Sequence, residues 1–170
     1  KKEFASRALA TDVLRLLQLM CEGHYNAMQT TLRHQPYIEN VDIDLLSDTY
    51  ELLQTLEPQV DSANQDQVQL CVDLLIEAMQ GNEGRANQKF LVEQTKLLQV
   101  LQRLLVMDGT ERNIEVEPML TLKKSCCECL LSLLERSQKD VEPMCLKQLD
   151  TAHLAQQVGE FHAAGRRSSC

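Results

Sequence analysis

Apolar residues recur at intervals of three and four positions from one end of the chain to the other, and alternation of apolar and polar residues persists nowhere. The spacing of three and four follows the 3.6-residue period of amphipathic helices, whereas alternation would indicate strands. The pattern therefore predicts an all-α protein without a sheet. The first helix is expected from about Phe4 to Glu22, with an apolar face made by Leu9, Val13, Leu16, Leu17 and Met20.

Two further helices are predicted before residue 60. Asn26 is placed to cap a short helix carrying Met28 and Leu32, which should end before Pro36 because the residue preceding a proline disfavours the helical conformation. The next helix is expected to begin near Asp42 or Asp44 and to end at Pro58. Its apolar stripe consists of Leu45, Leu46, Thr49, Leu52, Leu53 and Leu56.

The middle of the chain predicts two longer helices. The first, from about 65 to 80, should stop before Gly81, because glycine readily adopts the left-handed conformation that ends many helices. Its apolar positions are Val68, Cys71, Val72 and Leu75. A single long helix is then expected from about Ala86 to Met107, followed by Gly109, with its stripe at Leu91, Leu98, Leu101 and Leu105.

The last two helices open with the same four residues, Val-Glu-Pro-Met, at 116–119 and at 141–144. Proline near the first helical position loses no hydrogen bond, and the acid before it interacts favourably with the helix dipole. Connections of roughly three to ten residues favour antiparallel neighbours. Several helices are also apolar over more than a narrow seam. We therefore expect antiparallel helices in an armadillo-like or HEAT-like solenoid segment, as one domain over 1–164 with a disordered tail at 165–170.

The amino-acid composition indicates the kind of core and limits the classes of partner that the chain can bind. Aromatic residues make up 4% of the chain and tryptophan is absent, so the core should consist of aliphatic side chains, which suit helices. The formal net charge is −8, and the 17 Lys and Arg are scattered among 25 acids, which argues against binding to nucleic acid. The most apolar run, 97–107, contains Arg103 and is too short to span a bilayer. We expect no insertion of this chain into a membrane.

Seven cysteines form no pattern typical of secreted scaffolds, which favours reduced thiols and a cytosolic location. Cys126 and Cys129 form a C-x-x-C, and Cys21 with His24 forms a C-x-x-H, but a structural zinc site normally needs two C-x-x-C-like pairs. We expect these thiols to pack as small hydrophobic groups. The chain lacks a glycine-rich phosphate loop, a G-x-S-x-G turn and an H-E-x-x-H motif, so we expect no enzymatic activity.

One segment near the start of the chain carries a specific motif. Residues 17–24 read Leu-Gln-Leu-Met-Cys-Glu-Gly-His, and they are followed by Gln29 and by Leu-Arg-His-Gln at 32–35. This order resembles the "QLLCENH" and "LQNxLRxQ" segments of the RIH-associated domain in the intracellular calcium-release channels, the ryanodine and inositol trisphosphate receptors. Gly23 stands where that family usually has Asn.

Two later segments resemble the same domain. Residues 75–81 read Leu-Ile-Glu-Ala-Met-Gln-Gly and precede Asn87 and Gln88, which is similar to the family's "LTEYxQGPxxxNQ", with Asn82 in place of its Pro. A weaker match is Leu-Leu-Ser-Leu-Leu-Glu at 130–135. Together the resemblance spans most of residues 8–137.

The resemblance implies a calcium site. In the family, the activating ion is bound by a glutamate in each of the two motifs, and these correspond to Glu22 and Glu77. His24 and Gln80 correspond to the supporting residues. A remaining ligand in the family is a backbone carbonyl of a C-terminal segment near the pore, which this chain does not contain. We therefore expect weak calcium binding by the isolated chain.

The resemblance also implies a role within a larger protein. We expect the chain to be a fragment of a homotetrameric channel on the cytoplasmic face of the endoplasmic or sarcoplasmic reticulum. There it would act as a cytosolic regulatory domain that senses calcium and relays a conformational signal toward the pore. Its partners would be other domains of the same channel, including the pore-proximal segment.

The residues themselves leave an alternative open. Calcium takes carboxylate and carbonyl oxygens, and helix C-termini offer unpaired carbonyls, so Glu22 and Glu77 suit a cation if they lie together. In strict up-down order their helices end at opposite poles, so they can meet only if the short helix after Gly23 is a corner piece. The alternative makes both residues solvated surface glutamates on a helical-repeat scaffold that binds a partner peptide and no metal.

Overall fold

The structure is a computed structural model that describes residues 2–35, 43–81, 85–135 and 141–156. Helices account for 79% of these described residues, and no strand occurs among them, which confirms the predicted all-α class. The elements are α1 (Lys2–Cys21), α2 (Asn26–Thr31), α3 (Leu45–Leu56), η1 (Glu57–Gln59), α4 (Gln65–Met79), α5 (Ala86–Gln94), α6 (Leu97–Val106), η2 (Thr110–Arg112), α7 (Val116–Leu134) and α8 (Val141–Gln148).

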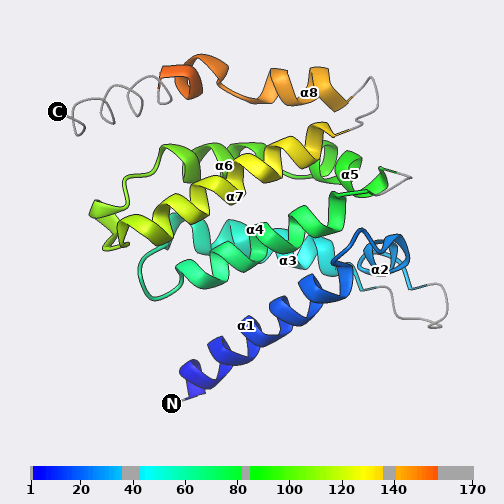
Figure 1. Cartoon of the computed structure of the whole chain (residues 1–170), viewed down its shortest axis with the longest axis horizontal. Helices are drawn as coiled ribbons and strands as arrows, with labels where there is room; N and C mark the ends of the chain where they lie inside the picture. The colour runs from blue at the N-terminus through cyan, green and yellow to red at the C-terminus, as the bar shows by residue number, and fades with distance from the viewer. Residues whose placement is uncertain (1, 36–42, 82–84, 136–140, 157–170) are drawn as a thin grey trace.

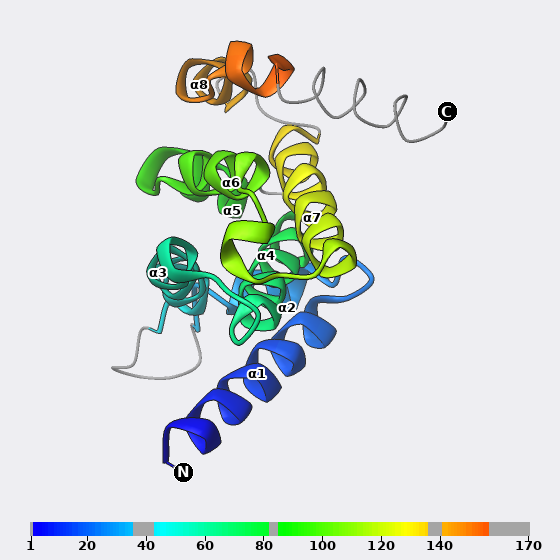
Figure 2. The ribbon, with the colours of Figure 1, turned by 90° about the vertical axis from the view of Figure 1, so that its left-hand side faces the viewer.

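The helices are stacked in layers, as Figure 1 shows from α1 at the bottom to α8 at the top. α4 lies in the middle of the stack, where it packs against α1 on one side, α7 on the other and α3 beside it. In the turned view of Figure 2, α3 and α6 lie in one rank and α4 and α7 in the other. Two ranks of stacked helices are the arrangement of a helical-repeat solenoid, so this prediction is also confirmed.

The core is aliphatic and centres on α4. This helix buries nine of its side chains, because it is enclosed by neighbours on several sides. They include all four residues of the predicted stripe, and the full set is Gln67, Val68, Cys71, Val72, Leu74, Leu75, Ile76, Ala78 and Met79. Such all-round burial is typical of an inner helix of a stack and not of a surface helix with one apolar stripe.

Most of the predicted helix ends are confirmed. The Asp44 side chain caps α3 by accepting a hydrogen bond of 2.9 Å from the backbone N–H of Ser47. Gly81 follows α4 in the left-handed region at φ +68°. Both Val-Glu-Pro-Met segments begin helices, α7 and α8. Asn26 was wrongly predicted as a cap, because it is the first residue of α2 and Tyr25 occupies the capping position.

The single helix predicted from Ala86 to Met107 is wrong, because it is divided into α5 and α6 at Thr95. Thr95 has an extended backbone, and its hydroxyl donates to the Leu91 carbonyl and accepts from the Leu97 N–H at 3.1 Å. A threonine hydroxyl can replace helical backbone partners in this way. The Lys96 N–H donates to the Tyr50 hydroxyl at 3.0 Å, which fixes the break against α3.

The predicted apolar face of α1 is also not the face that packs. Leu9, Val13, Leu16 and Met20 are 64%, 45%, 58% and 40% exposed. Of the predicted set, Leu17 alone packs against the core. α1 contacts α4 through a neighbouring stripe that contains Leu14 and Cys21, both buried. Hydrophobic spacing identified an amphipathic helix but selected the wrong side of it.

Arg103, which interrupts the apolar run of α6, forms a bidentate ion pair with Glu57 of η1, with a shortest distance of 2.7 Å.

Within the described segments, no helix combines the length and hydrophobicity that a membrane span requires. The predicted stop before Pro36 is confirmed, because α2 ends at Thr31. The alternative start at Asp42 and the tail at 165–170 lie outside the described residues.

Replacing Leu75 by Ala should lower the free energy of unfolding by about 2–5 kcal/mol, because it opens a cavity in the fully buried centre of α4. The matched change Leu9→Ala, on the exposed side of α1, should alter it by less than about 0.5 kcal/mol. Urea denaturation followed by circular dichroism measures both. Equal losses in the two variants would contradict the placement of α4 at the centre and of Leu9 at the surface.

Candidate calcium site at the ends of α1 and α4

The structure brings Glu22 and Glu77 together. Glu22 directly follows α1, and Glu77 lies in the last turn of α4. α1 and α4 pack against each other, and both end beside α2, as Figure 1 shows. The charge of Glu22 is one of the causes that raise the pKa of Glu77, so the two carboxylates interact electrostatically.

The corner that allows this meeting is the turn between α1 and α2. Gly23 and His24 both adopt left-handed backbone conformations, with φ of +75° and +61°. The Tyr25 N–H donates to the Cys21 carbonyl at 3.4 Å, which closes the turn. Consecutive left-handed residues reverse the chain within a short distance, so α2 folds back onto the end of α4. α2 is therefore a corner piece and not a member of the up-down order.

His24 lies over the turn that follows α4. A Cβ atom added at Gly81 would lie 2.7 Å from the Cβ and 2.9 Å from the Cγ of His24. Gly81 also has a positive φ, so it is required by both its backbone conformation and this close approach. The turn after α1 and the turn after α4 thus contact each other directly, with His24 and Gly81 at the contact.

Glu77 is half-buried, and its pKa is raised above the ordinary value of 4.5. Burial is the largest cause, and the negative charges of Glu22 and Asp73 raise the pKa further, whereas His24 lowers it. The ionised carboxylate is therefore held in an unfavourable environment. A cation beside it would relieve both the burial penalty and the repulsion.

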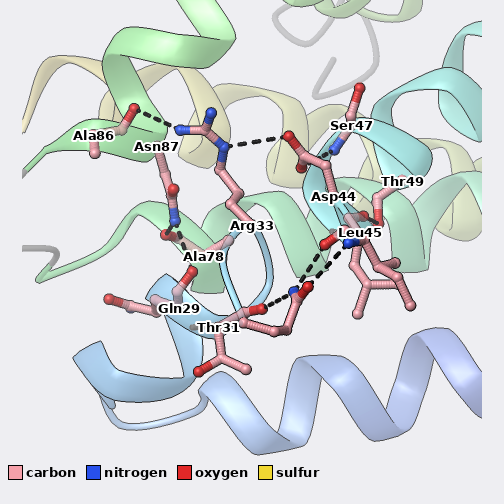
Figure 3. Close-up of polar contacts among 12 residues, drawn as sticks. Gln29, Thr31, Arg33, Asp44, Leu45, Ser47, Thr49, Ala78, Ala86 and Asn87 are labelled. Carbon is pink, nitrogen blue, oxygen red and sulfur yellow. Dashed lines mark hydrogen bonds and ion pairs between the residues drawn. The ribbon is translucent and has the colours of Figure 1, made fainter. Parts of the chain in front are cut away.

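Buried amides hold the last turn of α4 from two sides. Gln29 on α2 donates through Nε2 to the carbonyls of Glu77 and Gln80, at 2.6 Å each. Asn87 on α5 donates through Nδ2 to the carbonyls of Ala78 at 2.9 Å and Gln29 at 3.1 Å, as Figure 3 shows. The carbonyls that a helix leaves without intrahelical partners at its end are thus satisfied by side chains of neighbouring helices.

The same region is joined to the end of α7. The Gln80 amide donates to the Ser132 hydroxyl at 3.3 Å. Gln88 donates through Nε2 to the carbonyls of Ser132 and Glu135, at 2.6 and 3.0 Å. Gln80, predicted as a supporting residue of the calcium site, therefore directs its amide nitrogen toward α7 in this structure.

Arg33 fixes α2 from its other end. Its guanidinium lies 3.5 Å from the Asp44 carboxylate, which caps α3, and donates to the Ala86 carbonyl at 3.4 Å (Figure 3). It also stacks over the Phe90 ring, 3.9 Å from the ring centroid. A partly desolvated cation–π contact of this kind adds to the ion pair. The corner piece is thereby attached to α3 and α5 as well as to α4.

A family model described as "RyR and IP3R Homology associated" matches residues 5–105, which is more than half of the chain. The chain belongs to this family. No curated protein and no solved structure matches the chain. The matched residues run from α1 to α6, so both glutamates and the amides of Gln29, Asn87 and Gln88 lie within the part that defines the family.

Sequence reasoning assigned no role to several polar residues around the pair. The sequence indicates a role for four of them only through their place in segments that resemble the family: Gln29, Asn87, Gln88 and Ser132. Asp73 was missed, although its spacing of four places it on the face of α4 that carries Glu77.

Asp73 is half-buried, and its pKa is raised mainly by burial and also by the charge of Glu128. Hydrogen bonds from Ser125 and Gln69 oppose that rise, as does the charge of Arg15. Gln69 donates to Asp73 Oδ1 at 2.8 Å and to the Ser125 hydroxyl at 2.5 Å. A polar face of α4 therefore continues from the acidic pair along the boundary with α7.

The donor set fits calcium only incompletely. Two carboxylates and nearby helix-end carbonyls are oxygen ligands of the type that calcium prefers. Among the described residues, no group of three or more His, Cys, Asp or Glu is arranged to hold a metal ion. A calcium ion at this corner would therefore need further oxygen ligands to complete its coordination.

Cys71, Cys126 and Cys129 are fully buried in the apolar core, as predicted. Burial raises the pKa of the Cys71 thiol to about 12, and it also raises the pKa values of Cys126 and Cys129. The Cys21 pKa is raised to about 11 by burial and by the charge of Glu77. These thiols are protonated at neutral pH and are poor nucleophiles. Cys127 is exposed, on the outer side of α7.

Alkylation of the folded chain with iodoacetamide should modify Cys127 well before Cys71, Cys126 and Cys129, because only the exposed thiol meets the reagent. Peptide mass spectrometry at successive times gives the rate for each cysteine. In urea the rates should converge, which serves as the control. Rapid modification of Cys126 or Cys129 in the folded chain would contradict their burial.

Changing Glu22 to Gln should lower the pKa of Glu77 toward 4.5, because it removes one of the charges that disfavour the Glu77 carboxylate. NMR titration of the Glu77 side-chain carboxyl measures this shift. Glu128→Gln is the control, since Glu128 acts on Asp73 and is not among the groups that shift Glu77. An identical Glu77 pKa with and without Glu22 would show that the two carboxylates do not interact.

The raised pKa of Glu77 should also make the free energy of unfolding depend on pH. Glu77 has a higher pKa in the folded state than in the unfolded state, so the folded chain binds more protons between the two values. Stability therefore falls as the pH rises through that window. The Glu22→Gln change should make this fall smaller.

Proposed function

We propose that this chain is a cytosolic regulatory domain of an intracellular calcium-release channel and that Glu22 and Glu77 bind the activating calcium ion. Membership of the RyR and IP3R Homology associated family supports the channel context. The observation that carries the site is the convergence of the two glutamates, whose helices end at one corner although 55 positions separate them in sequence. His24 lies in the turn after α1 and acts electrostatically on Glu77, whereas Gln80, in the turn after α4, directs its amide nitrogen toward Ser132.

Electrostatics supports a cation at this corner. Two carboxylates about 4 Å apart repel by about 4 kcal/mol at an effective dielectric constant of about 20. The C-terminal ends of α1 and α4 add the partial negative charge of their helix dipoles. A calcium ion offsets these terms, so its binding favours the arrangement in which the two helix ends lie together.

Activation would follow if a second part of the channel completes the coordination. The proposed partner is the C-terminal, pore-proximal segment of the parent channel, a homotetramer in the reticulum membrane with this domain on its cytoplasmic side. Calcium then joins two protein parts, and it biases the gate by its differential affinity for the joined state. The chain itself has no enzymatic role in this proposal.

A helical-repeat scaffold without metal binding is the second candidate. The observation in its favour is the exposed apolar side of α1, with Leu9, Val13, Leu16 and Met20 at the surface. Apolar stripes of this spacing are typical of contacts with another helix. The two candidates differ in the effect of the glutamates, because a scaffold of this kind does not require Glu22 or Glu77 to be charged.

Glu77→Gln and Glu22→Gln should each shift calcium activation of the parent channel to higher calcium, by about tenfold or more, because affinity depends on the ligand charge. Single-channel recording over a range of cytosolic calcium measures the shift. The exposed Glu93→Gln is the matched control and should leave activation unchanged. The isolated chain should bind calcium only at about 10⁻³ M or above. Unaltered activation in both variants and in the double variant would refute the proposed site.

A further inference from the structure

Gln29 connects α2 to the turn that carries Glu77. Its side chain is fully buried, and its Nε2 lies 2.6 Å from the carbonyl oxygens of both Glu77 and Gln80. A single amide therefore bridges two carbonyls of the last turn of α4. Since α2 begins four residues after Glu22, the seating of α2 on α4 also determines where the turn containing Glu22 lies.

Asn87 reinforces the same junction from α5. It is 2% exposed, and its amide donates to the carbonyls of Gln29 and Ala78. Figure 3 shows this amide between the two carbonyls, one on α2 and the other on α4. The last turn of α4 is thus held by one amide from each of two neighbouring helices.

Burial alone does not account for a glutamine at position 29. Its Oε1 is buried and has no hydrogen-bond partner among the described residues. An unpaired buried oxygen is unfavourable, and an apolar side chain of the same length, such as methionine, would avoid it. The feature of glutamine that the structure uses is its pair of N–H donors, which meet the Glu77 and Gln80 carbonyls.

We propose that Gln29 is a positioning residue for the Glu77 carboxylate, in that its amide clamps the last turn of α4 to α2 and so fixes the placement of Glu77 relative to Glu22. The inference rests on the proposed calcium function for its consequence, since these two carboxylates are the assigned ligands. Replacing a residue that orients a metal ligand without binding the metal itself commonly lowers metal affinity about 10-fold to 100-fold.

The test uses Gln29→Met, with Gln67→Met as the matched control. Gln67 is also a buried glutamine, and its amide donates to the Arg7 carbonyl of α1 at 3.1 Å. It lies at the opposite end of α4 from Glu77. Two NMR readouts are taken on the 170-residue chain. One is the nuclear Overhauser contact between His24 and Gly81, which reports without calcium whether the two turns stay together. The other is the calcium affinity from a titration.

Gln29→Met should weaken the His24–Gly81 contact and reduce calcium affinity by about tenfold or more, whereas Gln67→Met should preserve both even if it lowers stability. A contact of full intensity in folded Gln29→Met would overturn the inference. Equal losses of affinity in the two variants would also overturn it, because reduced stability would then suffice as the cause.

Asn87→Ala tests the same junction if Gln29→Met does not fold. It should weaken the His24–Gly81 contact in part, and an unchanged contact would count against the clamp. Failure of the proposed function has a separate signature. If the unaltered chain shows no calcium-dependent shifts at Glu22 or Glu77, the calcium assignment fails, and the His24–Gly81 contact still decides whether Gln29 holds the two turns together.

Discussion

α4 ends where α2, α5 and α7 meet it, and the carbonyl groups of its last turn need donors from other elements. A helix end on the surface would take these bonds from water, but Gln29 and Asn87, which supply them here, are almost completely buried. The need for donors therefore dictates that amide side chains from α2 and α5 converge on this turn. Their convergence determines where the corner after α1 lies and hence where Glu22 meets Glu77.

This placement works against the stability of the ionised pair. A carboxylate near a helix C-terminus faces the negative end of the dipole, and Glu77 is also half-buried and close to another acid. Such groups are uncommon in regions shaped only by packing, and perturbed carboxylates cluster at functional sites. The burial of Gln29 Oε1, which has no hydrogen-bond partner in the described part of the chain, is a second unfavourable feature of the same corner. Two departures from optimal stability at one place favour a binding role there.

The helical class and most helix positions could be predicted from the sequence, because a 3.6-residue period and end signals such as Asp44 and Gly81 are local properties. The break at Thr95 could not, since it depends on a bond to Tyr50 that is distant in sequence. The packed side of α1 was also missed, because Leu14 and Leu16 are equally apolar and only tertiary contact with α4 distinguishes them.

The candidate site, too, could be predicted from the sequence only in part. Glu22 and Glu77 could be proposed only through the family resemblance, because nothing in their local sequence separates them from solvated glutamates. Their convergence depends on the left-handed backbone at His24, a conformation that its residue type does not predict. Gln29 and Asn87 act through backbone carbonyls of other helices, so their partners leave no pattern in the sequence.

In a stacked fold each layer contacts only its neighbours, so a change at the boundary of α1 and α4 reaches α7 through α4. The apolar contacts along this path fix the distance between layers but tolerate sliding, because hydrophobic burial has no direction. Hydrogen bonds from Gln80 and Gln88 to the end of α7 do have direction and fix the register of one helix on the next. In the proposed function, a cation that draws Glu22 and Glu77 together would shift the turn that carries Gln80. Asn87 links that turn to α5, the helix that carries Gln88. Directional polar contacts at the helix ends are therefore better suited than the core to carry a small displacement through the stack.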